Sequence, residues 1–85
     1  MKYIYIYILR SINFPVKTYI GITSDIKRRL REHNQGKCKH TSKYRPWRVE
    51  VYVVFRNKMD GIRFEKYLKS GSGRAFIKRH LVQSH

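Results

Sequence analysis

Five side chains in this sequence have the chemistry that an active site needs: Tyr7, Tyr19, Arg29, His33 and Glu65. A free tyrosine has a pKa near about 10 and is a poor base alone, but a neighbouring cation or metal ion favours its phenolate. Arg29 and His33 are four residues apart, so on a helix their side chains can converge on one point. Glu65 offers a hard oxygen ligand for a divalent cation. Such groups could activate water, neutralise a phosphoryl group and assist the departing alkoxide.

The charge balance indicates a polyanionic partner. The 85 residues include 20 Lys and Arg against 5 Asp and Glu, a net charge of +15 spread along the whole chain. A polyanion would relieve the self-repulsion of such a chain, and nucleic acid is the leading candidate. The alternatives are a soluble basic protein without this partner and a protein that binds anionic lipid. No predicted helix combines a wide apolar face with a basic one, as a membrane-surface helix does.

The scarcity of acids limits any metal chemistry to very few carboxylates: Asp25, Glu32, Glu50, Asp60 and Glu65. One carboxylate cannot hold a divalent ion tightly. Magnesium, however, keeps several of its waters and is commonly completed by substrate phosphates. We therefore expect a site for one Mg²⁺ or Mn²⁺ ion that assembles only on DNA.

Two segments of strict alternation must position the tyrosines. Residues 3–8 alternate between tyrosine and isoleucine, and Leu9 follows, so the segment 3–9 predicts a strand with isoleucines on one face and tyrosines on the other. Such a segment would aggregate if exposed, so we expect it in the middle of a sheet. Residues 11–15 are turn formers, and the alternation resumes over 17–22, which predicts a hairpin. Gly21 would leave room beside Tyr19.

A helix is predicted over residues 25–34. Residues 23–25 offer a hydroxyl cap and an acid for the first turn. Ile26 and Leu30 mark the buried stripe, and Gly36 ends the helix.

The basic stretch 37–45 lacks periodicity and predicts a loop. The alternation over residues 47–55 predicts a third strand, with Trp47 in the core. One face of this strand is expected to carry Val49, Val51 and Val53.

Two further helices are predicted over residues 58–69 and 74–81, with 70–73 interrupting them. The order β-β-α-β-α-α describes an α+β fold, a small three-stranded antiparallel sheet flanked by helices. The length leaves room for one domain over residues 1–85.

Four segments in order resemble the motifs of the GIY-YIG nuclease superfamily: 5–7, 19–21, 25–34 and 64–69. The likeness is greatest to the small stand-alone bacterial members related to the nuclease domain of excinuclease subunit UvrC. It is strengthened by Thr23, residues 45–47 and residues 68–71. The resemblance implies an α/β sandwich and single-metal hydrolysis of phosphodiester bonds in DNA, which we expect at structured or damaged sites.

The resemblance also implies how the residues divide the work. Tyr7 matches the tyrosine of the first motif and would be the general base, and Tyr19 would position the attacking water or the scissile phosphate. Gly21 would allow close approach of the backbone.

On the helices, the resemblance makes Arg29 the residue that neutralises phosphoryl charge, His33 an aid to proton transfer or phosphate contact, and Glu65 the metal ligand. Two departures stand against it. Tyr5 replaces the first-motif glycine, which the stand-alone members often lack, and no asparagine follows Asn57, although Arg74 or Lys78 could serve in place of that asparagine.

Nine basic residues are predicted to bind DNA: Lys17, Arg28, Arg31, Lys37, Lys39, Lys43, Arg45, Arg74 and Lys78. The alternative function is a nucleic-acid-binding module that kept the fold and lost the chemistry; a ribosome-associated basic protein would need no such constellation. The single Cys38 excludes an internal disulfide and fits a reducing compartment. We expect a cytoplasmic, nucleoid-associated protein without a membrane segment, either a monomer or one assisted by a partner.

Overall fold

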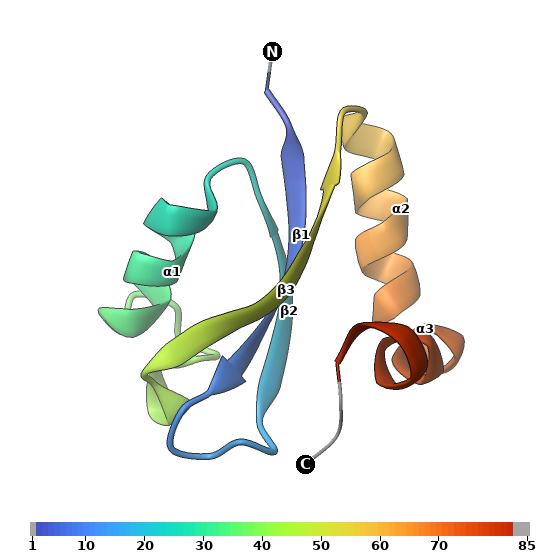
Figure 1. The fold of residues 1–85 in the computed structure, drawn as a ribbon. Helices are drawn as coiled ribbons and strands as arrows, with labels where there is room; N and C mark the ends of the chain where they lie inside the picture. The colour runs from blue at the N-terminus through green and yellow to red at the C-terminus, as the bar shows by residue number, and fades with distance from the viewer. Residues whose placement is uncertain (1, 83–85) are drawn as a thin grey trace.

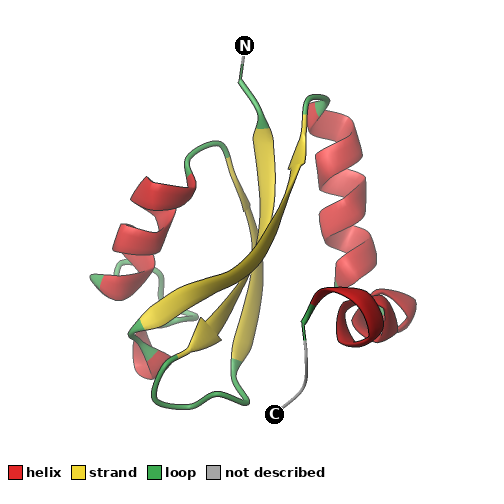
Figure 2. Cartoon of the chain, viewed as in Figure 1, coloured by secondary structure: helices red, strands yellow, loops and turns green. Residues whose placement is uncertain are grey.

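The computed structural model describes residues 2–82 and has an α+β fold with a three-stranded antiparallel sheet, as predicted (Figures 1 and 2). The strands and helices are β1 (Ile4–Ser11), β2 (Thr18–Thr23), α1 (Ile26–Asn34), β3 (Trp47–Phe55), α2 (Lys58–Leu68) and α3 (Gly71–Phe76). The described residues also form a 3₁₀ turn over Ser42–Tyr44 and a π-helical turn over Ile77–Leu81.

The sheet has the order β2-β1-β3, so the tyrosine and isoleucine strand lies in the middle, as predicted. In the register of the sheet, Tyr7 is opposite Gly21 on β2 and opposite Tyr52 on β3. Strand β2 is therefore an edge of the sheet beside Tyr7.

Helices cover both faces of the sheet, with α1 on one face and α2 and α3 on the other (Figure 1). The tyrosine face packs against α1, where Tyr7, Leu9 and Trp47 form a buried core. The isoleucine face packs against α2. A Cβ atom on Gly61 would lie 2.8 Å from Ile4 Cγ2, so the glycine allows α2 to lie close to β1.

Asn34 joins α1 to β3 through its side-chain amide. Asn34 Nδ2 donates to the carbonyl oxygen of Trp47 at 3.1 Å, and Trp47 N donates to Asn34 Oδ1 at 2.6 Å. Trp47 is buried, as predicted, and its Nε1 donates to the carbonyl oxygen of Thr41 at 2.8 Å. The helix that carries Arg29 and His33 is thus held to the sheet at its C-terminal end.

The predicted faces of β3 are wrong at one position. A bulge opposite Ile8 and Leu9 pairs Ile8 with Val51 but Leu9 with Val49. Because a bulge places one extra residue in one strand, the alternation shifts there. Val49 therefore lies on the α1 side, where it packs against the buried core that contains Tyr7, and does not share a face with Val51.

Two helix boundaries also differ from prediction. Asp25 itself caps α1, its Oδ1 accepting from Arg28 N at 3.0 Å, so the cap is a carboxylate and not a hydroxyl. The segment 70–73 begins α3, and Ser70 caps it by accepting from Gly73 N at 3.1 Å. A Cβ atom on Gly73 would lie 1.8 Å from the carbonyl oxygen of Tyr67, so the absence of a side chain at this position lets α3 pack against the end of α2. Gly36, with φ of 79°, follows the end of α1 as predicted.

Candidate active site

Tyr7 points from the central strand across to the edge strand β2. Its ring lies against Gly21, where a Cβ atom would be only 2.3 Å from Tyr7 Oη. Any side chain at this position would therefore displace the Tyr7 ring. The space that the sequence indicated beside Tyr19 is occupied by Tyr7, which is only 3% exposed.

His33 of α1 meets both tyrosines. Its Nε2 lies 3.0 Å from Tyr7 Oη, and its ring packs at centroid distances of 5.9 Å from Tyr7 and 5.2 Å from Tyr19. The two tyrosine rings are 6.5 Å apart. The structure thus brings together three of the five predicted catalytic residues, from two strands and one helix, and we call this group with its neighbours the Tyr7 cluster.

Thr41 is a member of the Tyr7 cluster that the sequence did not indicate. Its Oγ1 lies 2.7 Å from His33 Nδ1 and donates to the carbonyl oxygen of Cys38 at 3.4 Å. Oγ1 can accept from Nδ1–H while it donates to Cys38, and in that tautomer of His33 the Nε2 atom accepts from the Tyr7 hydroxyl. Thr41 lies in a loop without periodicity, so no spacing rule connects it with His33.

Arg29 is a further member of the Tyr7 cluster and lies one helical turn before His33. It lines a small cavity with Tyr7, together with Leu9, Ile26, Leu30 and Val49. Its Nη1 donates to Glu32 Oε1 at 2.9 Å, which holds the guanidinium in a defined orientation. About a third of the Arg29 side chain is exposed, so this cation is accessible next to Tyr7.

Burial keeps both members of the Tyr7 and His33 pair uncharged at neutral pH. Desolvation raises the pKa of Tyr7 to about 12, although the Arg29 guanidinium acts in the opposite direction. Desolvation lowers the pKa of His33 below its usual value, and Arg29 acts in the same direction. The resting state is therefore a neutral phenol hydrogen-bonded to a neutral imidazole.

Glu65, the fifth predicted residue, is on a different helix from the residues of the Tyr7 cluster. It belongs to α2, on the opposite face of the sheet from α1 (Figure 1). Its side chain is 15% exposed, and Oε2 lies 2.6 Å from Lys69 Nζ. No group of three or more His, Cys, Asp or Glu side chains that could hold a metal ion exists within residues 2–82. The donor set available for a divalent ion is one carboxylate, which fits an ion completed by water and phosphate.

Comparison with known proteins decides the family. The model of the GIY-YIG catalytic domain family matches residues 3–79, nearly the whole chain. The chain belongs to this family. It is a GIY-YIG catalytic domain, and the five predicted catalytic residues all fall within the matched segment.

The curated relatives include structure-specific endonuclease subunits. The SLX1 subunit of Candida dubliniensis is 40% identical over 84 residues, which cover 89% of this chain and 28% of the relative. The SLX1 subunit of Malassezia globosa is 45% identical over 64 residues, 69% of this chain and 14% of the relative. This GIY-YIG domain thus spans less than a third of the length of these relatives.

Among solved structures, the solution structure of the UPF0213 protein BH0048 of Bacillus halodurans superimposes with a TM-score of 0.56. It is 27% identical, and the match covers 95% of this chain and 88% of that one. The fold of this chain is therefore shared by a solved protein of similar length. These three relatives support the family and not a specific relation to UvrC, which stays a prediction.

All nine residues predicted to bind DNA are exposed on this GIY-YIG domain. Lys17 and Lys43 lie over the ring of Tyr44, with Nζ at 5.0 and 5.6 Å from the ring centroid. Arg28 Nε lies 4.0 Å from a carboxylate oxygen of Glu32. Exposure is necessary for contact with phosphates, and the contact itself stays a prediction. No helix within residues 2–82 has the length and apolarity of a membrane span.

The pH dependence of stability should report the neutral state of His33. Because the pKa of His33 is lower in the folded than in the unfolded protein, the unfolded state binds more protons as the pH falls through about 6.5. The stability from a neutral, buried His33 is fully present above that pH and is lost progressively below it. We expect urea unfolding to show this loss between about pH 7.5 and about pH 5.

The matched control for this prediction is His33→Gln, whose amide can still pair with Thr41 and Tyr7 but does not titrate. Subtracting its pH profile removes the contribution of the carboxylates, which also lose their ion pairs in acid. Parallel profiles for the two proteins would contradict a neutral, buried imidazole.

Proposed function

We propose that this GIY-YIG domain is a metal-dependent DNA endonuclease that hydrolyses phosphodiester bonds at structured or damaged sites. The observation that carries the proposal is the hydrogen bond of 3.0 Å between Tyr7 Oη and His33 Nε2, beside the accessible Arg29. The names of the SLX1 relatives, structure-specific endonuclease subunits, support the choice of DNA structure over DNA sequence. A net charge of +15 suits a DNA substrate.

Tyr7 acts as the general base through His33. With a pKa of about 12, only about 1 in 10⁵ of Tyr7 side chains is a phenolate at pH 7, so Tyr7 alone is a weak base. The neutral His33 can accept the phenolic proton at Nε2 as Tyr7 Oη takes a proton from the attacking water. The hydroxide character then develops on the water, and the positive charge ends on the imidazolium. Thr41 holds the tautomer that makes this transfer possible.

Arg29 and Tyr19 act on the phosphate. The guanidinium neutralises the charge that develops on the phosphoryl oxygens, and the Arg29 orientation set by Glu32 removes reorganisation from that step. Tyr19 is half-buried on the edge strand beside His33, so its hydroxyl can position the water or the scissile phosphate.

Glu65 is the residue that would hold the divalent ion, Mg²⁺ or Mn²⁺. When bound, the ion supplies a Lewis acid for the phosphoryl oxygens and the leaving group. The Glu65 carboxylate must exchange Lys69 for the ion, because Lys69 is its partner in the structure.

The alternative is a nucleic-acid-binding module with the same fold and no chemistry. To separate the two, supercoiled plasmid and branched oligonucleotides are incubated with the protein and Mg²⁺ or Mn²⁺. We expect nicking or cutting that stops when a chelator removes the ion, while DNA binding by gel shift persists. Binding without cutting on every substrate, with either ion, would establish the binding module instead.

Site specificity requires more than this domain. An 85-residue domain offers little surface for reading a sequence, and the SLX1 relatives are named as subunits. A partner protein or a second copy would then add specificity for sequence.

A further inference from the structure

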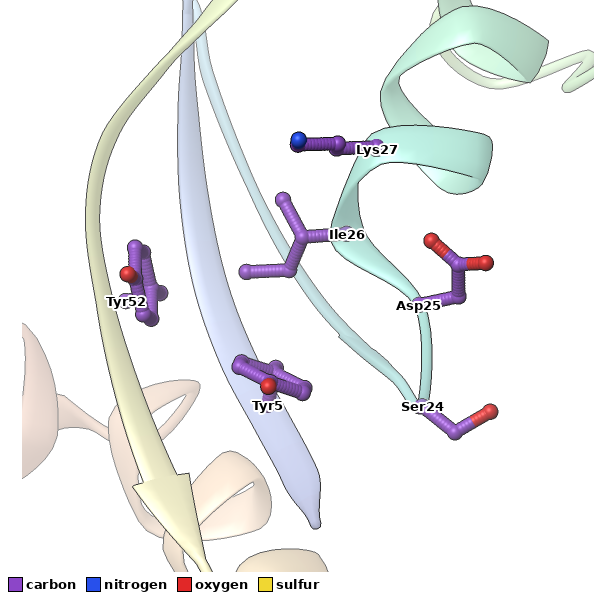
Figure 3. Close-up of a pocket in the computed structure, with 6 residues that line it drawn as sticks. All are labelled: Tyr5, Ser24, Asp25, Ile26, Lys27 and Tyr52. Carbon is purple, nitrogen blue, oxygen red and sulfur yellow. The ribbon is translucent and has the colours of Figure 1, made fainter. Parts of the chain in front are cut away.

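An open hollow lies beside the N-terminus of α1 and is not part of the Tyr7 cluster. Its volume is about 380 Å³, and it is lined by Tyr5, Ser24, Asp25, Ile26, Lys27 and Tyr52 (Figure 3). Tyr5 stands where the first motif of the family has a glycine. The hollow is therefore built partly by the residue that replaces the glycine of the first motif.

Two tyrosine rings form one wall of the hollow. The centroids of Tyr5 on β1 and Tyr52 on β3 are 5.7 Å apart, with the rings tilted by 58°. Tyr52 is 52% exposed, and Val54, the sheet partner of Tyr5, is 42% exposed. A half-exposed Tyr52 ring beside Tyr5, on a protein with a net charge of +15, suits a ligand with both a flat apolar face and negative charge.

The wall opposite the two tyrosines carries one cation that points into the hollow. Figure 3 shows the ammonium group of Lys27 extending from α1 toward the strands, whereas the carboxylate of Asp25 points away from the tyrosines. Asp25 is occupied in capping α1, since its Oδ1 accepts from Arg28 N at 3.0 Å. An aromatic wall facing one lysine matches a nucleotide, whose base can stack and whose phosphate can pair with the cation.

The hollow adjoins the Tyr7 cluster. Ile26 lines both the hollow and the small cavity that Tyr7 shares with Arg29. Tyr5 and Tyr7 lie on one face of β1, two residues and therefore about 7 Å apart. A nucleotide in the hollow would belong to the DNA strand close to the phosphate that is cut.

We propose that this hollow binds an unpaired nucleotide of the DNA substrate, with its base on Tyr5 and Tyr52 and its phosphate at Lys27. A base inside a duplex is stacked on its neighbours and cannot occupy the hollow, so the site favours DNA with a single-stranded segment next to the cut. This inference rests on the proposed nuclease function and names the feature of structured DNA that the domain recognises.

The test is the affinity of the protein for fluorescent single-stranded and hairpin duplex oligonucleotides, measured by anisotropy with chelator present so that no cutting occurs. We expect Tyr52→Ala to weaken single-strand binding by about tenfold and to change duplex binding by less than about twofold, since phosphate contacts dominate the latter. Tyr52→Phe keeps a stacking face and should bind as the wild type does.

Met59→Ala is the matched control, because Met59 is an apolar residue of similar exposure on α2, across the sheet from the hollow. Circular dichroism checks the fold, and Tyr52→Leu replaces Tyr52→Ala should the latter unfold. Equal single-strand affinity of Tyr52→Ala and the wild type overturns the proposal. The exposed tyrosines would then be a binding surface for a protein partner. Equal losses on single-stranded and duplex DNA overturn the proposal as well.

Cutting is measured separately on a branched substrate. A wild type that does not cut, combined with a selective loss of single-strand binding in Tyr52→Ala, would end the nuclease proposal and keep the nucleotide site. A wild type that cuts, combined with unchanged single-strand binding in Tyr52→Ala, would keep the nuclease proposal and end the proposal of a nucleotide site.

Discussion

Glu65→Gln should lower the rate of plasmid nicking by at least about 10³-fold, because it removes the carboxylate proposed to hold the divalent ion. Affinity for DNA should change by less than about twofold, since lysine and arginine contacts with phosphates dominate binding. Thermal stability should also be nearly unchanged, because the Lys69 partner is half exposed and such pairs contribute little. Nicking assays, gel shifts and thermal melts measure the three quantities.

Asp60→Asn is the matched control for Glu65→Gln. Asp60 is another acid of α2, its side chain is 54% exposed, and its partner is Arg63 on the same helix. Removing its charge should leave cutting intact. Wild-type cutting by Glu65→Gln would contradict the assignment of the metal ligand, and the position of α2 across the sheet from Tyr7 makes this the sharpest test of it. An equal loss of binding would show that Glu65 supports DNA contact instead.

Tyr7→Phe should lower cutting by about 10²- to 10⁴-fold, the range for removal of a general base. It should also lower the free energy of unfolding by about 1–3 kcal/mol, because His33 Nε2 is left buried without its donor. His33→Gln should reduce cutting as well. Since both residues serve one proton transfer, the double variant should be little slower than the slower single variant. Single-turnover rates and urea unfolding supply the numbers.

Tyr19→Phe is the comparison that can contradict this assignment. Tyr19 is half-buried and lies on the edge strand, so it is more accessible to water than Tyr7. If Tyr19→Phe loses more activity than Tyr7→Phe, Tyr19 is the base and Tyr7 positions His33. A small effect of Tyr19→Phe supports the transfer from water through Tyr7 to His33.

Alternation and helical spacing were sufficient for the strands, the first two helices and part of the site. The period of two over residues 3–9 predicted β1, which extends two residues further to Ser11, and the same period over 47–55 predicted β3 at its observed bounds. The spacing of four between Arg29 and His33 placed both on the face that α1 turns toward Tyr7. These features are local, because a side chain's direction along a strand or helix follows from the backbone alone.

Long-range register decided the rest. By alternation alone, Tyr5 and Tyr7 are equivalent. Tyr7, however, is paired with Gly21, so its ring can cross β2 and reach His33. The bulge in β3 moved Val49 to the α1 side, and a loop without periodicity brought Thr41 to His33. Pairing between distant segments depends on how the whole sheet packs, which no short stretch of sequence contains.

The motifs and the charge of this sequence were thus enough to indicate its family and a nucleic-acid partner. Only the tertiary structure showed that a buried phenol is hydrogen-bonded to a buried imidazole, that Glu65 pairs with Lys69 on a helix of the opposite face of the sheet, and that Tyr5 and Tyr52 face Lys27 over an open hollow. The physical reason is that burial and contact between segments, which set the pKa values and shape the hollow, arise only when the strands and helices have packed together.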